Sequence, residues 1–250
     1  MDWRERDGVR WLEATLPRAR AAFSSRAGGV SEAPYESLNL AILTGDDRGA
    51  VRENRHRLAG ALGLAAERVV IGRQVHGAEI AWHAGPQDPS PFAGPGTADP
   101  PELDGQVTDR DDLAPLVFVA DCLPVAVAGK GGVAMLHCGW RGLAGGIVQR
   151  GVEAVAGSAA AIGPGIGPCC YEVGEEVLAR FLPLGEGVAR DVSGRRMLDL
   201  AAVARRLLER SGVARVEAAG LCTSCEPELF FSHRRDGERT GRQAGLVWRD

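Results

Sequence analysis

The sequence predicts an α+β fold with mixed parallel and antiparallel strands, formed by a single domain over residues 1–250. A chain of 250 residues is long enough to bury one large core. Hydrophobic residues make up 45% and charged residues 25%, which is ordinary globular composition and argues against long disordered segments. Helix-like and strand-like segments follow one another without strict βαβ alternation, so a doubly wound parallel sheet is not expected.

In the first 104 residues, the patterns predict one helix, two strands and a long loop. Residues 47–62 carry apolar side chains at helical spacing on a polar background, which is typical of a surface helix. The segments 69–71 and 75–82 are rich in β-branched residues and predict strands. Residues 85–104 are dense in proline and glycine, and long loops of this kind are usually functional lids or disordered segments.

The middle of the chain has the clearest strand pattern. Three short apolar runs, at 116–122, 124–128 and 133–138, predict buried strands, and the glycine-rich turn at 129–132 joins the last two. Residues 142–155 then show helical spacing. The remaining predicted elements are a strand at 159–162, helices at 175–181 and 198–211, a strand at 216–221, and a hairpin that pairs 229–232 with 245–248.

Charge and composition exclude several classes of protein. The net charge of −4 provides no basic field for nucleic acid or an anionic membrane. No apolar run is long enough to span a bilayer, and the charged segment from Met1 to Trp11 does not resemble a signal peptide. Six cysteines without a secretion signal indicate reduced thiols. We therefore expect a soluble, cytoplasmic protein. The composition does not indicate its oligomeric state.

Three residues at the ends of predicted strands form a possible metal site. His76 follows Val75, Cys122 ends the run 116–122, and His137 ends an apolar run. Two imidazoles and one thiolate suit zinc, and three protein ligands leave a position for water or substrate. Two alternatives remain: a cysteine nucleophile with His137 as its base, or histidines that are only hydrogen-bonded core residues.

The segment after His137 leads from a strand into a helix and contains Arg141. A helix start offers free N–H groups, and a guanidinium can hold an oxyanion with two parallel hydrogen bonds. This pattern indicates a phosphate or carboxylate site. The alternative is a tight turn with a surface arginine.

The other cysteines and His233 carry weaker signals. Cys169 and Cys170 are adjacent, so their side chains are expected to diverge. Cys222 and Cys225 have redox spacing, but one such pair is insufficient to indicate a metal, and buried unreactive thiols are expected. His233 falls in the final predicted hairpin, from which it could approach the pocket.

Several motifs, in order along the chain, resemble those of the YfiH family, also called polyphenol oxidase or laccase-domain proteins. The resemblance runs from about residue 23 to residue 248. The matching segments are 25–31 (SRAGGVS), 37–40 (SLNL), 74–77 (QVHG), 120–122 (ADC), 137–142 (HCGWRG), 162–164 (IGP), 170–173 (CYEV), 230–232 (FFS) and 240–242 (TGR). Cys225 has no counterpart in the family's pattern.

The resemblance implies a layered α/β/β/α sandwich and a zinc-dependent purine nucleoside phosphorylase. Its substrates would be inorganic phosphate and adenosine, inosine, guanosine or methylthioadenosine, with adenosine deamination as a side activity. His76, Cys122 and His137 are the implied zinc ligands. For this reaction we further predict catalytic roles for Asp121 and Arg141, and substrate binding by Arg26, Asn39 and Arg141.

Two other activities are compatible with the family. The first is a cysteine or zinc hydrolase that acts on peptidoglycan precursors, because the family includes the peptidoglycan editing factors. The second is a copper-dependent polyphenol oxidase, which we rank last. Five histidines are too few for four coppers, and the chain lacks the His-x-His pairs of a multicopper centre.

Overall fold

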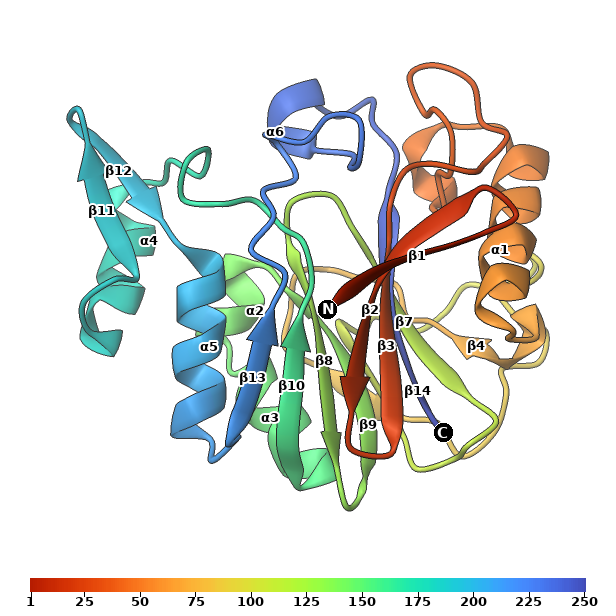
Figure 1. The fold of residues 1–250 in the computed structure, drawn as a ribbon, viewed down its shortest axis with the longest axis horizontal. Coiled ribbons are helices and arrows are strands. Elements are labelled where there is room, and N and C mark those ends of the chain that lie inside the picture. Colours follow the sequence, from red (N-terminus) through yellow and green to blue (C-terminus); the bar gives the residue numbers. More distant parts are fainter.

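Two six-stranded sheets packed face to face form the framework of the computed structural model, which describes residues 1–250 (Figure 1). In order across the first sheet the strands are β1 (Asp2–Arg6), β2 (Val9–Leu16), β3 (Ala19–Ser24), β14 (Gln243–Arg249), β7 (Ala114–Val119) and β4 (Val69–Val70). Neighbours are antiparallel except β4 and β7.

The second sheet is also mixed. Its order is β13 (Arg215–Ala218), β10 (Gly157–Ile162), β8 (Leu123–Gly129), β9 (Gly132–Cys138), β6 (Gly105–Thr108) and β5 (Ile80–Trp82). The two outer pairs are parallel and the inner ones are antiparallel. A separate hairpin joins β11 (Ala189–Val192) to β12 (Arg195–Leu198).

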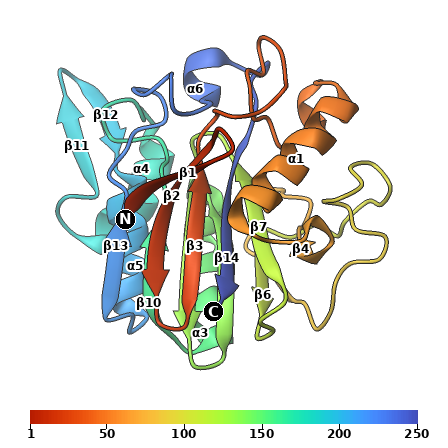
Figure 2. The ribbon, with the colours of Figure 1, turned by 45° about the vertical axis from the view of Figure 1, so that its right-hand side comes forward.

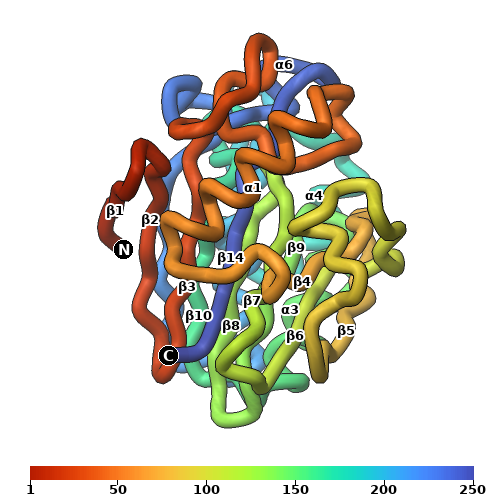
Figure 3. Tube along the Cα trace, turned by 90° about the vertical axis from the view of Figure 1, so that its right-hand side faces the viewer, coloured from red at the N-terminus to blue at the C-terminus, as the bar shows by residue number.

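Helices cover both outer faces of the sandwich. On the first sheet lies α1 (Arg48–Leu62), which Figure 3 shows in front of β3, β14 and β7. On the second sheet lie α3 (Ile147–Val155) and α5 (Leu200–Arg210), with α4 (Glu175–Phe181) beside them (Figure 2). The short α2 (Trp140–Ala144) packs against α3, α4 and α5 (Figure 1). The short α6 (His233–Asp236) lies in the loop before β14. No helix is both long and apolar enough to cross a membrane.

Three apolar layers match this arrangement of four layers. Phe23 and Val117 of the first sheet pack with Met135 and Ala161 of the second, all at most 1% exposed. A second layer lies between α1 and the first sheet, and a third lies between the second sheet and its helices. The predicted α/β/β/α sandwich with mixed sheets is therefore confirmed.

Two predicted elements are wrong, the first because of long-range strand pairing and the second because of a local glycine break. Residues 229–232 form no strand, and β14 pairs with β3 and β7 instead of closing a final hairpin. The helix predicted at 142–155 is broken between α2 and α3 at Gly145 and Gly146, where Gly146 has a φ of +88°. The strands β1–β3, β6 and β11–β12 were not predicted.

The strands nearest the predicted metal ligands are shorter than their patterns indicated. The segment 75–82 is extended only in β5, and the run 116–122 leaves the sheet after β7. Cys122 thus lies in the turn between β7 and β8, directly before Leu123, which pairs with Cys138. The end of β7 and the end of β9 consequently meet at one edge of the sandwich.

Candidate active site

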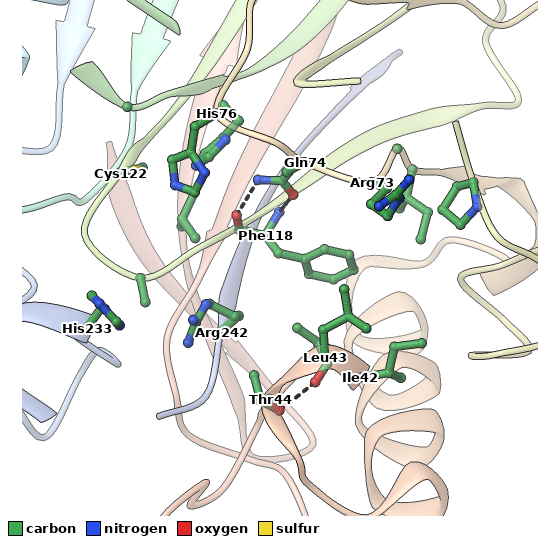
Figure 4. Close-up of a pocket in the computed structure, with 18 of the residues that line it drawn as sticks. Ile42, Leu43, Thr44, Arg73, Gln74, His76, Phe118, Cys122, His233 and Arg242 are labelled. Carbon is green, nitrogen blue, oxygen red and sulfur yellow. Dashed lines mark hydrogen bonds between the residues drawn. The ribbon is translucent and has the colours of Figure 1, made fainter. Parts of the chain in front are cut away.

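A cavity of about 850 Å³ opens at this edge, between loops of the two sheets and residues 41–44, which precede α1. Its wall includes the side chains of His76, Cys122 and His137 at one end, and Figure 4 shows His76 beside Cys122. Phe118 and Leu43 supply apolar surface further along the cavity. The volume is within the range of about 300–1,000 Å³ that is typical of ligand pockets.

The three predicted metal ligands come together although they are distant in sequence. Their donor atoms, two imidazole nitrogens and one sulfur, all lie within 4.8 Å of one another. The rings of His76 and His137 meet edge to face, with centroids 4.9 Å apart. A Cβ on Gly139 would lie 2.9 Å from the Cys122 sulfur, so only glycine leaves this sulfur its space.

A buried carboxylate, Asp104, orients this group from behind. Asp104 is 0% exposed, and its Oδ1 lies 2.7 Å from Nδ1 of His137, which donates to it. The proton on Nδ1 leaves Nε2 of His137 as the nitrogen available to a metal, the arrangement found in many zinc sites. Asp104 was not predicted, because a single aspartate before a strand has no distinctive sequence pattern.

The same carboxylate shapes the loop that carries His76. The backbone N–H groups of Val75, His76 and Gly77 donate to Asp104 at 3.1, 3.0 and 2.7 Å. This is why residues 75–77 bend around the carboxylate instead of extending into the predicted strand, and why His76 has a φ of 61°. The side chain of Gln74 anchors the loop to the backbone of Phe118 on β7 (Figure 4).

The electrostatics of the group favour a thiolate. Burial alone would raise the pKa of the Cys122 thiol, but the imidazoles of His137 and His76 lower it to about 6. Burial likewise opposes a charge on His137, whereas the Cys122 thiolate and Asp104 raise the pKa of His137 to about 9. A thiolate is the form of cysteine that binds a metal or acts as a nucleophile. The donor set, its spacing and its charge fit one zinc ion.

Asp121 lines the cavity next to Cys122 and is held rigidly. Its Oδ1 accepts a hydrogen bond from the Thr223 hydroxyl at 2.7 Å, and its Oδ2 accepts one from the backbone N–H of Arg234 at 2.6 Å. Its φ of 90° lies in the left-handed region, which costs a residue with a side chain about 1–3 kcal/mol. Such strain persists only where the surroundings fix the conformation.

Arg141 also lines the cavity and has no partner in the protein. Its guanidinium lies 4.5 Å from the centre of the Trp140 ring and makes no hydrogen bond or ion pair. The helix that carries it, α2, is only five residues long, so the anion-binding part of the prediction depends on the side chain and not on a helix dipole.

The other two predicted substrate-binding residues do not line the cavity. Arg26 donates to the carbonyls of Glu36 and Pro227 and stacks on the Phe231 ring at 4.5 Å. Asn39 is fully buried, where it donates to Asp46 and accepts from the backbone N–H of Arg242 at 2.9 Å. Both side chains join the loops behind the cavity, and substrate contact by them stays a prediction.

Several residues of the cavity were not predicted. Tyr171, Arg234 and Arg242 line it, and His233 does so from α6, as anticipated. The long loop 85–104 contributes Pro91 and residues 96–100 to the wall. Because these residues come from distant segments, no local motif indicates that they meet.

The fold and the site define a class of protein: a four-layer α+β sandwich with a His–Cys–His group in a cavity at one edge. Residues 20–250 match the family described as multi-copper polyphenol oxidoreductase laccase, and the chain belongs to this family, as the motifs had predicted.

Relatives with known names or structures agree over nearly the whole chain. A purine nucleoside phosphorylase, YlmD, from Geobacillus stearothermophilus is 38% identical over 96% of this chain and 94% of its own. A purine nucleoside phosphorylase from Deinococcus radiodurans is 40% identical over 96% and 93%. The crystal structure of the hypothetical protein YfiH from Bacillus licheniformis, 31% identical, superposes with a TM-score of 0.90 and covers 99% of both chains.

Proposed function

We propose that this protein is a cytoplasmic, zinc-dependent purine nucleoside phosphorylase with adenosine deaminase side activity. The observation that carries the proposal is the His–Cys–His group in one cavity with the unpaired Arg141. The names of the relatives from G. stearothermophilus and D. radiodurans support the reaction class. We expect adenosine, inosine, guanosine and methylthioadenosine as substrates.

His76, Cys122 and His137 would hold the zinc ion, which supplies a Lewis acid at the end of the cavity. In phosphorolysis, a phosphate oxygen forms a bond to C1′ of the ribose while the bond from C1′ to the purine nitrogen breaks. The electron pair leaves with the base, which then takes up a proton. The protein must therefore bind an anion, hold the ribose and stabilise negative charge on the purine.

Particular side chains of the cavity suit these tasks. Arg141 has all its donors free for phosphate, whereas Arg242 already donates to the carbonyls of Thr240 and Gly241. Asp121 keeps acceptor capacity beyond its two hydrogen bonds, and it would orient a ribose hydroxyl or exchange a proton. The rings of Phe118 and Tyr171 offer apolar surface for the purine.

Product analysis tests the proposal directly. With adenosine or inosine, turnover is expected to require inorganic phosphate and to yield ribose 1-phosphate and the free base. Release of free ribose without phosphate would make the protein a nucleoside hydrolase. Activity on UDP-linked muramyl precursors with no turnover of nucleosides would favour the cell-wall hydrolase. Oxidation of phenols that depends on copper would favour the oxidase.

Exchange of Arg141 for lysine is expected to weaken the phosphate-dependent step by about ten- to a hundredfold. Lysine keeps the charge but cannot make two parallel hydrogen bonds, and a hydrogen bond to a charged group contributes about 1.5–3 kcal/mol. The KM for phosphate should rise or phosphorolysis should slow, while zinc content and Tm stay unchanged. Deamination uses water and should change much less.

Arg150→Lys is the matched control, because Arg150 lies on α3 outside the cavity and pairs with Glu79 on the surface. This variant should keep the KM for phosphate. An equal loss of phosphorolysis and deamination in Arg141→Lys would show that Arg141 holds the nucleoside or the fold and does not bind phosphate.

A further inference from the structure

Four of the six cysteines form a second group, separate from the His–Cys–His group, and all four are at least partly exposed. The sulfur atoms of Cys169, Cys170, Cys222 and Cys225 all lie within 4.8 Å of one another. The Cys225 sulfur is 3.4 Å from the sulfurs of both Cys169 and Cys170. The expectation that Cys169 and Cys170 diverge is therefore wrong, and so is the expectation that these four thiols are buried.

Two turns explain how adjacent cysteines reach one point. The N–H groups of Cys170 and Tyr171 both donate to the carbonyl of Gly167, so this segment is a helical turn and not a strand. In such a turn, successive side chains are separated by about 100° and not by 180°, and neighbours can face the same side. Cys225 and Glu226 donate to the carbonyl of Cys222 in the same way.

The sheet brings these two turns together. They follow β10 and β13, which are parallel neighbours, so both chains leave the sheet at the same edge. A bridge between Gly165 and Cys222 continues this pairing beyond the strands. A Cβ on Gly167 would lie 3.2 Å from both the Cys169 sulfur and the Cys222 Cβ, so glycine permits the close approach.

We propose that these four cysteines form a second metal site, which binds one zinc ion in a tetrahedral, structural arrangement. Zinc–sulfur bonds of 2.3 Å in a tetrahedron place the sulfurs about 3.8 Å apart. Sulfurs that are 3.4 Å apart at the closest and no more than 4.8 Å apart in any pair need only small rotations to reach this geometry. Four protein ligands leave no open position, so the ion would stabilise the fold and take no part in the reaction.

Backbone and exposure favour a bound cation here. The N–H of Gly167 points at the Cys222 sulfur at 3.2 Å, a contact that stabilises a thiolate. Cys169 and Cys225 are exposed, so an ion can enter from solvent. A disulfide is the competing chemistry, but it requires a sulfur–sulfur distance of about 2.05 Å and would leave two of the four thiols unused.

The site would also support the wall of the cavity. Thr223, between Cys222 and Cys225, donates to Asp121. Tyr171, directly after Cys170, lines the cavity. Zinc bound by the two turns would therefore fix the positions of Thr223 and Tyr171, and its loss should loosen Asp121.

The test is the zinc content of reduced protein loaded with Zn²⁺ and freed of excess metal. Wild-type protein should hold two equivalents, and Cys225→Ser should hold one and melt at a lower temperature. Ser224→Ala is the matched control: it changes the same turn but no sulfur, and it should keep both equivalents. Cys122→Ala, which alters only the first site, should keep one.

Two results would overturn the proposal. One is a Cys225→Ser protein that binds as much zinc as the wild type. The other is a reduced Cys122→Ala protein that binds no zinc. This second result tests the proposal even if Cys225→Ser does not fold. A third outcome separates the two sites: the wild type holds one equivalent of zinc, Cys225→Ser holds none, and Cys122→Ala keeps one. The four-cysteine site is then supported, and zinc binding by the His–Cys–His group, on which the proposed function depends, is contradicted. A protein without phosphorolysis that still holds two equivalents leaves the second site intact.

Discussion

Exchange of Cys122 for serine is expected to remove zinc from the cavity and to abolish phosphorolysis. The hydroxyl of serine stays protonated at neutral pH, whereas the Cys122 thiol, with a pKa of about 6, is mostly a thiolate. Loss of a residue that only supports a metal ligand lowers metal affinity by roughly 10–100-fold. Because Cys122 is itself a ligand, its loss should lower zinc affinity by more than that. Zinc content and phosphorolysis are measured on the same sample, with Cys138→Ser as a control that changes a buried thiol outside the group.

The reactivity of the metal-free protein separates the zinc enzyme from a cysteine hydrolase. Above a pH of about 6 the thiolate of Cys122 is available, so iodoacetamide should modify it at pH 7 and much more slowly at pH 5. Peptide mapping identifies the modified residue, and bound zinc should protect it. If chelation leaves full activity and iodoacetamide then abolishes it, Cys122 is a nucleophile and the zinc mechanism is wrong.

The sequence was most informative about site residues that are recognised by their chemical type, and least informative about those whose role depends on which strands pair. His76, Cys122 and His137 could be selected because few residues offer such ligands and the motifs resemble those of a family. Asp104 could not, because its role depends on β6 pairing with β9, which places Gly105 opposite Leu136 beside His137. No short-range pattern specifies that pairing.

The same limit explains the errors in the fold. Residues 245–248 are correctly predicted as a strand, but β14 inserts between β3, which ends at Ser24, and β7, which begins only at Ala114. For Cys169 and Cys170, the expectation of divergence assumed an extended chain, and a helical turn reverses it. Local patterns therefore located most elements, whereas the partners of each element required the structure.

Exchange of Asp104 for asparagine is expected to weaken zinc binding by about 10–100-fold and to destabilise the fold by several kcal/mol. Four donors converge on this carboxylate: three backbone N–H groups and Nδ1 of His137. Asparagine has one acceptor oxygen, and its NH₂ group would face donors that it cannot satisfy. Zinc affinity and the free energy of unfolding measure the two effects.

The contribution of Asp104 to stability should depend on pH. Burial opposes ionisation of Asp104, but His137 and the backbone donors outweigh it and lower the pKa of the carboxylate. The stability that the carboxylate contributes is therefore complete above the unfolded pKa of about 3.9 and is lost as pH falls through the lower folded value. The difference in unfolding free energy between the wild type and Asp104→Asn should shrink below about pH 4 and stay constant between about pH 5 and 6. It should shrink again as pH rises above the ordinary pKa of His137, about 6.5, because Asp104 helps to raise the pKa of His137 in the folded protein to about 9. Asp109→Asn, which changes an exposed aspartate directly after β6, should match the wild type throughout. A zinc affinity of Asp104→Asn equal to that of the wild type would show that Asp104 supports the loop alone and does not orient His137.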